Sequence, residues 1–384
     1  MDLNKITPMI VESLEDLSKN GLVNLIPALE RLMNELMKIE REQVLQAAPY
    51  ERTERREGYA NGFKNKHLKT RFGQLQLDVP KTRGVPFYPS CLEKGDVTEK
   101  ALKNALAEMY VQGVSTRRVK KITEELCGTE VSSSQVSRMA KILDEELEGF
   151  RNRDLGKIRY LYLDADYQKV RHNGHVIKMA CLKAVGVNEE GYREVLGISC
   201  NLSEAEVHWR KFLEGLTTRG LHGVELVISD DHAGLRGALQ SHFTSVPWQR
   251  CLFHLAQNAQ SYVPQVKYRE EVGREIREIY QAAKLGEAEN RKKEFIKEWE
   301  EKAPELCEWL EENFIEGLTF FNYPKAHWKK IRTVNVVERL NQEVKRRTRV
   351  ARLFPNEESC ERLVTAIAKN IHEDWMSGKR YIAD

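Results

Sequence analysis

The stretch Val227-Ile228-Ser229-Asp230-Asp231-His232-Ala233-Gly234-Leu235 decides how the rest of the chain is interpreted. Its apolar β-branched run is typical of a buried strand, and the small residues after the two acids are typical of a turn into a helix. A carboxylate therefore lies at the carboxyl end of a strand, which is where open α/β sheets bind their ligands. A second polar stretch, Gln249-Arg250-Cys251-Leu252-Phe253-His254, follows at a short distance.

The segment before this stretch predicts an antiparallel sheet that continues into it. Strands are expected at Ile158–Val170, Val176–Val187 and Tyr192–Cys200, and turn residues separate them. Ser203 and Glu206 have the spacing of a capping box for the next helix, which leads to a fourth strand at Val224–Ser229. The order βββαβα predicts an α/β fold.

Beyond a short strand near Val246–Cys251, residues 255–322 have helical spacing and no strand signal. A block of that kind inside an α/β domain predicts an inserted all-α subdomain. Asn335–Arg349 then predicts a single helix, with Val337, Leu340 and Val344 on one face.

Two acids are expected to meet at the sheet. Asp164 lies within the first strand, and Asp230 ends the fourth, which can lie beside the first. An acid inside a strand is costly to bury unless it is paired or binds a cation, so side-by-side carboxylates suggest ligands for Mg²⁺. Asp166 shares the face of Asp164 and competes with it, whereas strand alternation directs Asp231 away from Asp230.

We choose Glu338 as the third acid. The surrounding segment 328–349 holds eight Lys and Arg residues against two acids, which suits a polyanion backbone next to a metal site. On spacing alone, an ordinary i,i+4 surface pair on the helix is the favoured explanation of Glu338. Cys251 and His254 suggest zinc, but two ligands are too few. Trp299 and Trp328 could stack on an unpaired base, although aromatic residues at helical spacing usually belong to a core.

The N-terminal part predicts packing and DNA contact. An amphipathic helix over 22–37 is expected to pack or to self-associate. Segment 51–83 holds nine Lys and Arg residues against four acids, and its strand-like part contains Lys69 and Arg71. These basic residues favour phosphate contacts, and a solvated basic face fits them as well.

A helical hairpin follows, and it resembles a helix-turn-helix. Ser115 can cap its first helix, Cys127-Gly128-Thr129 break it, and Ser132 with Gln135 forms a capping box for the second. The second helix presents Ser133, Gln135 and Arg138 near its start, as a DNA-reading helix does. Any helical hairpin can share this pattern.

The whole chain is expected to be a water-soluble cytoplasmic protein of several domains. It has 384 residues, 31% of them charged, with a net charge of only +3, so a nucleic-acid surface must come from local patches. Its seven cysteines lack paired spacing, which suits reduced thiols. No apolar run approaches the roughly 20 residues that span a bilayer.

These motifs together resemble a bacterial insertion-sequence transposase of the Mutator type. The matching set is Asp230-x-x-x-Gly234-Leu235, then Gln249-Arg250-Cys251-x-x-His254, then His327-Trp328-x-x-Ile331-Arg332-Thr333-x-Asn335-x-x-Glu338-Arg339. The resemblance implies an RNase H-like core interrupted by an all-α insertion, catalytic acids at Asp164, Asp230 and Glu338, and His254 beside them. Asp166 and Asp231 depart from the common pattern by adding carboxylates.

The resemblance also implies a reaction. Three carboxylates would hold two Mg²⁺ ions, for which Mn²⁺ can substitute, and would activate water against a phosphodiester. The freed 3′-hydroxyl would then attack target DNA, without the covalent protein intermediate of serine and tyrosine recombinases. The expected partners are the terminal inverted repeats, target DNA and a second copy of the chain in a nucleoid-associated synaptic complex. Further DNA contacts are expected at Arg250, Trp328, Lys330, Arg332, Arg339, Arg346 and Arg347.

The sequence thus predicts six segments and leaves three functions open. The segments are a helical region 1–50, a basic β-containing segment 51–95, a helix-turn-helix domain 96–154, the core 155–254, the insertion 255–325 and the core's end 326–384. A transposase is favoured. An RNase H-like nuclease or resolvase that cuts without joining, and a non-catalytic DNA-binding regulator, are the alternatives.

Overall fold

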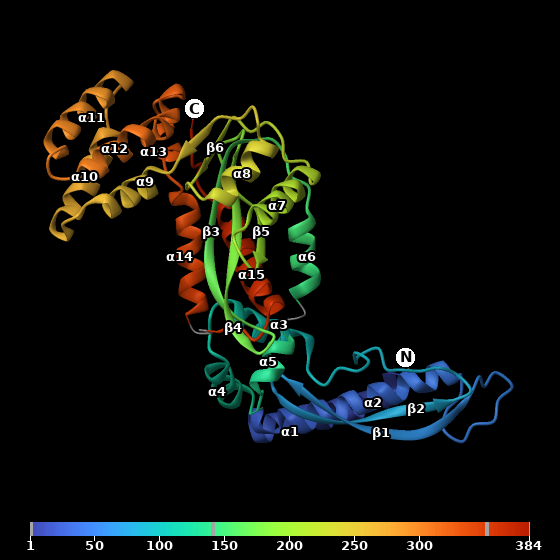
Figure 1. The fold of residues 1–384 in the computed structure, drawn as a ribbon. Coiled ribbons are helices and arrows are strands. Elements are labelled where there is room, and N and C mark those ends of the chain that lie inside the picture. Colours follow the sequence, from blue (N-terminus) through green and yellow to red (C-terminus); the bar gives the residue numbers. More distant parts are fainter. Residues whose placement is uncertain (1–2, 129, 140–142, 350–352, 384) are drawn as a thin grey trace. The chain divides into compact units, whose positions relative to one another are not determined.

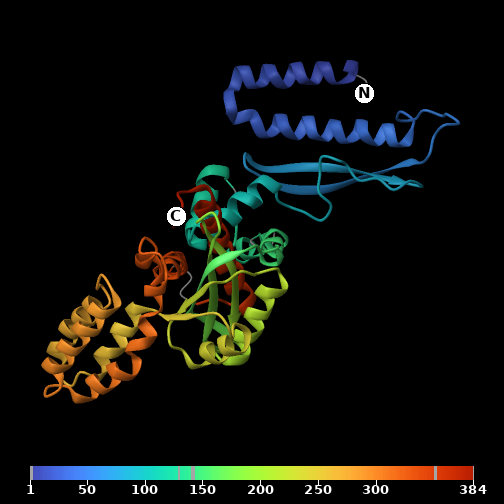
Figure 2. The same ribbon diagram turned by 90° about the horizontal axis from the view of Figure 1, so that it is seen from above.

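The computed structural model describes residues 3–128, 130–139, 143–349 and 353–383 (Figures 1 and 2). The chain divides into two compact units, Met1–Ile142 and Leu143–Asp384, called here the N-terminal and C-terminal units. No helix in the described part of the chain is long and apolar enough to cross a membrane.

A helical hairpin packed on a β-hairpin forms the first part of the N-terminal unit. Its elements are α1 (Leu3–Asn20), the short η1 (Gly21–Asn24), α2 (Leu25–Leu45), β1 (Tyr59–Thr70) and β2 (Gly73–Arg83). Gly21 has a φ of 66°, which ends the first helix, and Pro27 lies in the first turn of α2, where a missing N–H is tolerated. Met37 of α2 packs against Leu75 and Leu77 of β2.

Three helices complete the unit: α3 (Lys100–Val111), α4 (Thr116–Cys127) and α5 (Ser133–Met139). The predicted caps are present. The Ser115 hydroxyl accepts a hydrogen bond from the Arg118 N–H, and Gln135 and Ser132 each accept one from the other's backbone N–H. Residue 129, in the predicted turn, lies outside the described residues.

The C-terminal unit is built on one mixed sheet of five strands. They are β3 (Ile158–His172), β4 (His175–Asn188), β5 (Arg193–Asn201), β6 (Leu226–Ser229) and β7 (Trp248–Arg250). The order is β5-β4-β3-β6-β7, in which β3, β4 and β5 are antiparallel neighbours and β6 and β7 run parallel to β3. The prediction that the fourth strand lies beside the first is confirmed.

Helices cover both faces of the sheet (Figure 1). Leu161 and Leu163 of β3 face the apolar core formed with α7 (Glu206–Thr218) and α8 (Ala233–His242). The alternate residues of β3 face α14 (Asn335–Thr348) and α15 (Glu357–Ser377), where Asn341 of α14 reaches Asp164. The expected Ser203 cap is wrong, because α7 begins after Ala205 without a side-chain cap.

The predicted helical insertion is present after β7. It comprises α9 (Leu252–Ala259), α10 (Arg269–Ile279), α11 (Leu285–Trp299) and α12 (Pro304–Asn313), and the short α13 (Trp328–Ile331) follows it. Trp299 is fully buried and donates its indole N–H to Glu275, so it is a core residue and not a platform for a base. Helix α6 (Asp144–Asn152) lies in the C-terminal unit and pairs through Asp144 with Arg362 of α15, whereas the sequence-based prediction assigns this segment to the helix-turn-helix domain.

Replacing Leu213 with alanine is expected to lower the free energy of unfolding of the C-terminal unit by about 2 to 5 kcal/mol, because the side chain is fully buried between α7 and the sheet. Val207→Ala on the same helix is the matched control, since Val207 is 65% exposed, and should change it by less than about 0.5 kcal/mol. Urea unfolding followed by tryptophan fluorescence measures this, because all six tryptophans lie in this unit. Equal losses in both variants would contradict the packing.

Candidate active site

Asp164 and Asp230 lie next to each other on neighbouring parallel strands. Tyr162 of β3 pairs with Ile228 of β6, and each acid follows two residues after its member of that pair. Asp164 is buried, and this desolvation, with the Asp230 charge as the second cause, raises its pKa to about 7. Burial also raises the pKa of Asp230. The side-by-side arrangement predicted from the strand order is therefore present.

A chain of buried polar side chains holds Asp164. Asn341 of α14 donates its amide N–H to Asp164 Oδ2 at 2.6 Å, and its amide oxygen accepts from Lys183 Nζ. Lys183 also forms an ion pair with Asp166, and Gln168 donates to the second oxygen of Asp166 at 2.7 Å. Asp166 is thus already neutralised within the protein. Of the two acids of β3, Asp166 has a charged protein partner, whereas Asp164 has only the neutral amide of Asn341 as a side-chain hydrogen-bond donor.

Asp231 belongs to a different network. Its carboxylate lies 3.2 Å from Arg236 and 3.2 Å from Arg250. Arg250 also lies 2.8 Å from Glu316 and donates to Asn313 at 2.6 Å, and only 2% of its side chain is exposed. This burial argues against the expected contact between Arg250 and DNA, because acids and an amide of the chain already occupy the guanidinium.

Glu338 lies in the first turn of α14, close to His254 and Cys251 of the segment after β7. Ligand atoms of the three residues lie within 4.8 Å of one another. Cys251 accepts a hydrogen bond from the Val334 N–H at 3.4 Å, and burial raises its pKa to about 12. Cys251, His254 and Glu338 offer three ligand atoms, one fewer than a structural tetrahedral zinc site takes.

Two histidines flank Asp230. Positive charge on His254 and on His232 would stabilise its carboxylate, and both lower its pKa against the larger effect of burial. His232 lies 3.5 Å from Glu204, whose pKa burial raises. His254 Nδ1 is buried and has no hydrogen-bond partner in the structure.

The site fits a divalent cation. Asp230 Oδ1 and Glu338 Oε1 are buried and have no hydrogen-bond partner in the structure. A buried carboxylate oxygen without a donor is costly unless a cation or proton faces it. Hard carboxylate oxygens are the ligands that Mg²⁺ and Mn²⁺ prefer.

A basic groove of about 560 Å³ runs along the exposed side of α14. Arg339, Arg346 and Arg347 line it together with Arg193 of β5. Glu343 pairs with Arg346 at 2.7 Å and with Arg347 at 2.8 Å, which lowers the pKa of its carboxyl to about 2. The guanidinium groups outnumber the acids in the groove, so it suits a phosphate backbone.

Three other residues that are expected to contact DNA interact with protein groups in the structure. Trp328 is half-buried, donates its indole N–H to the Tyr323 carbonyl at 2.7 Å and packs on Phe321. Lys330 lies over the Tyr381 ring at 4.2 Å, and Arg332 donates to the Tyr280 carbonyl at 3.4 Å. These three side chains have protein partners already.

In the N-terminal unit, Arg138 is exposed, and Gln135 is occupied in the capping box. Arg71 is exposed and pairs with Glu99 at 2.6 Å, while Lys69 Nζ donates to the Glu130 carbonyl at 2.6 Å. The side chain of Ser133 lies outside the described residues.

Comparison with known proteins identifies the family of this chain. A family model described as "Transposase, Mutator family" matches residues 9–378. The chain belongs to the Mutator family of transposases.

Relatives in this family align over nearly the whole chain. The chain is 50% identical over 368 residues to the transposase for insertion sequence element IS406 of Burkholderia multivorans, covering 95% of each. It is 44% identical to the transposase for ISRM5 of Rhizobium meliloti, covering 91% of this chain and 88% of the relative. It is 38% identical to the transposase for IS256 in transposon Tn4001 of Staphylococcus aureus, covering 96% and 93%.

Sequence reasoning missed two residues of the candidate site of this transposase, Lys183 and Asn341. Asn341 follows Glu338 by three positions, which places both on neighbouring parts of one helical face, and that spacing could have found it. Lys183 is a charge inside the buried part of β4, where its neighbours are apolar, and such a charge is costly to bury without a partner. The sequence therefore shows that Lys183 needs a partner, but it does not identify Asp166 as that partner, because Asp166 lies in another strand.

The raised pKa of Asp164 predicts how stability changes with pH in the ion-free protein. Its folded-state pKa of about 7 exceeds the ordinary value of about 3.9. Between these two pH values the folded protein therefore binds more protons than the unfolded chain does. The free energy of unfolding therefore falls as pH rises through this window. In Asp164→Asn, the decrease in the free energy of unfolding across this window should be smaller by a value on the order of 3 kcal/mol.

Urea unfolding between about pH 5 and pH 8 with a chelator tests this expectation. Glu343→Gln is the control, because the pKa of Glu343, about 2, lies outside the window and the slope should not change. The same slope in Asp164→Asn and the unchanged protein would show that Asp164 is not a protonated buried acid.

Proposed function

We propose that this chain binds the terminal inverted repeats of its insertion sequence and performs metal-dependent DNA cleavage and strand transfer with Asp164, Asp230 and Glu338. One observation carries the proposal. Asp230 and Glu338 each have a buried carboxylate oxygen without a hydrogen-bond partner in the structure, and the neighbouring Asp164 has a carboxyl group with a raised pKa. The strand order, with the helical insertion before α14, supports an RNase H-like core.

These three acids would hold Mg²⁺, or Mn²⁺ in its place. When bound, such a cation polarises the phosphodiester and lowers the pKa of water. The chain's own residues prepare this. Asn341 fixes the orientation of Asp164 through Oδ2, and Lys183 in turn fixes Asn341. His254 Nδ1 is free to donate to a phosphate oxygen or to one of the carboxylates when protonated.

DNA would lie along positive surface in both units. In the C-terminal unit the basic groove beside α14 offers Arg339, Arg346 and Arg347 to phosphates. In the N-terminal unit α4 and α5 have the length and the caps of a helix-turn-helix, with Arg138 exposed on the second helix. Joining two DNA ends requires two active sites, so we propose a homodimer or larger assembly with α2 as one interface.

Asp164→Asn, Asp230→Asn and Glu338→Gln should each reduce strand transfer on the order of 100-fold or more while DNA binding stays, because each removes charge from the reacting centre. Glu343→Gln, on the same helix as Glu338 but paired with arginines, is the matched control and should retain activity. A terminal-repeat duplex with Mg²⁺ and separate cleavage and joining readouts measures both steps. Full activity in any one of the three variants would show that the replaced residue is not one of the catalytic acids.

The same assay decides between the function classes. Cleavage without joining by the unchanged protein would favour the nuclease or resolvase, and DNA binding without cleavage at any Mg²⁺ concentration would favour the regulator. The three carboxylates argue against the regulator, and the helical insertion with a separate N-terminal DNA-binding region argues against the nuclease or resolvase.

Arg346→Ala should weaken DNA binding about equally for all sequences and lower the slope of log affinity against log salt by about 1, because it removes one phosphate contact. Arg274→Ala on α10 is the control. Arg274 is also an exposed arginine beside a glutamate, at 3.9 Å from Glu278, but lies outside the groove. Titrations at several salt concentrations measure the slope. A slope unchanged by Arg346→Ala would contradict the groove as a DNA surface.

A further inference from the structure

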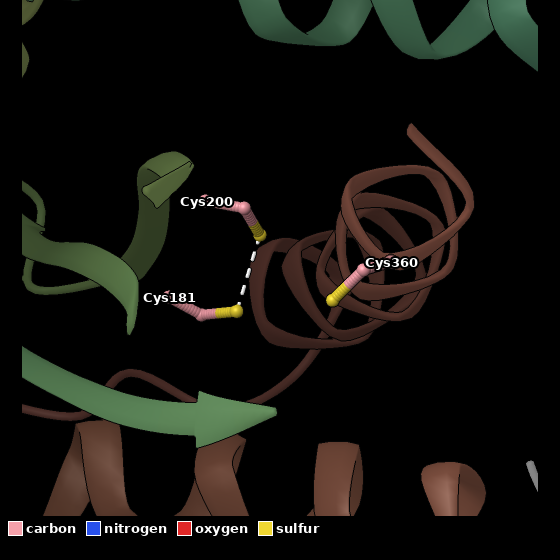
Figure 3. A group of neighbouring side chains, drawn as sticks. All are labelled: Cys181, Cys200 and Cys360. Carbon is pink, nitrogen blue, oxygen red and sulfur yellow. Dashed lines mark hydrogen bonds between the residues drawn. The ribbon is translucent and has the colours of Figure 1, made fainter. Parts of the chain in front are cut away.

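Three thiols meet on the face of the sheet that α15 covers. Cys181 of β4 and Cys200 of β5 are direct cross-strand partners, and Cys360 comes from α15 (Figure 3). The three sulfur atoms lie within 4.8 Å of one another. Cys181 and Cys360 are buried, and Cys200 is partly exposed. None of them has a part in the proposed DNA chemistry.

Cys181 and Cys200 are placed for a covalent bond. Their sulfur atoms lie 3.1 Å apart, joined by the dashed line in Figure 3. Opposite residues of antiparallel strands have Cα atoms about 4.5 to 5.5 Å apart, which is within the range for disulfides. Two thiolates around a tetrahedral metal ion with bonds of about 2.3 Å stand about 3.8 Å apart, so the observed spacing favours the disulfide over a shared ion.

We propose that Cys181 and Cys200 are a site of reversible oxidation, at which a small hydroperoxide closes a cross-strand disulfide. Cys181 is the attacking group, since hydrogen bonds from the Cys200 and Cys360 thiols lower its pKa well below the ordinary value. Cys200 supplies the second thiol, with its pKa raised mainly by its bond to Cys181. Cys360 helps to hold the thiolate and is not itself joined.

The reaction balances in two steps. The Cys181 thiolate attacks one oxygen of hydrogen peroxide, the O–O bond breaks, and Cys181 becomes a sulfenic acid as hydroxide leaves. The Cys200 sulfur then attacks the Cys181 sulfur, the S–O bond breaks, and the oxygen leaves as water with the Cys200 proton. The hydroxide takes up a proton from solvent. Two thiols have given two electrons to one peroxide, which becomes two waters.

Mapping disulfides in the folded, full-length protein tests the site. After hydrogen peroxide acts on the folded protein and denaturant then exposes every thiol, two of the seven thiols should no longer react with an alkylating reagent, and peptide mass spectrometry should find Cys181 joined to Cys200. A dithiol reductant should restore both. Cys200→Ala should abolish the cross-link, whereas Cys360→Ala, the matched control from the same cluster, should keep it. Tryptophan fluorescence confirms that each variant is folded.

Two outcomes would overturn the proposal: seven reactive thiols after peroxide treatment, or a cross-link that joins another pair of cysteines. Neither outcome bears on the proposed transposition, because the mapping needs neither DNA nor metal. The site is therefore tested independently of the proposed function.

The thiol cluster adjoins the polar chain that holds Asp164. Asp166 is the cross-strand partner of Cys181, and its ion-pair partner Lys183 follows Cys181 by two positions, on the same face of β4. Resting on the proposed function, oxidation should therefore lower strand transfer reversibly in the unchanged protein and in Cys360→Ala, but not in Cys200→Ala. Equal peroxide sensitivity in all three would overturn this coupling.

Discussion

The constraint on which the C-terminal unit depends is a pair of neighbouring carboxylates, the buried Asp164 of β3 and the half-buried Asp230 just after β6. Asp164 and Asp230 each oppose the ionisation of the other, and burial adds to that cost, as the pKa of about 7 for Asp164 shows. The sheet can hold them only because other groups compensate. The Asn341 amide satisfies one oxygen of Asp164, and Lys183 neutralises the extra acid, Asp166.

This polar chain also explains how α14 is aligned on the sheet. Asn341 contacts both Asp164 on β3 and Lys183 on β4, so the helix is tied to two strands by one side chain. Glu338 lies one turn earlier on the same helix, and its position relative to the strand acids follows from that attachment. The Val334 N–H, which bonds to the Cys251 sulfur, holds the start of α14 against the segment after β7.

The second buried charge network connects the sheet to the helical insertion. Arg250 ends β7 and binds Asn313 and Glu316 at the end of the insertion, while Asp231 binds Arg250 and Arg236. A buried guanidinium with several acceptors is strongly destabilised if one is removed. Asp231, the extra acid beside Asp230, therefore has a structural role. The two neighbouring carboxylates point to different places, because Asp230 faces the candidate site and Asp231 faces the two arginines.

The sequence by itself determined most of the elements and pointed to the acids of the candidate site. The strand alternation, the turns between the strands, the helical spacing of the insertion and the Ser132–Gln135 capping box are local patterns, so local backbone preferences are enough to predict them. The Ser203–Glu206 spacing misled, because Glu206 pairs with Arg210 and the cap is absent. Only the tertiary structure decided which acids are already neutralised, that Arg250 is buried, and that Cys181, Cys200 and Cys360 meet. Those facts depend on which distant side chain lies opposite each group, and burial and pairing are properties of the packed chain, which residue spacing does not encode.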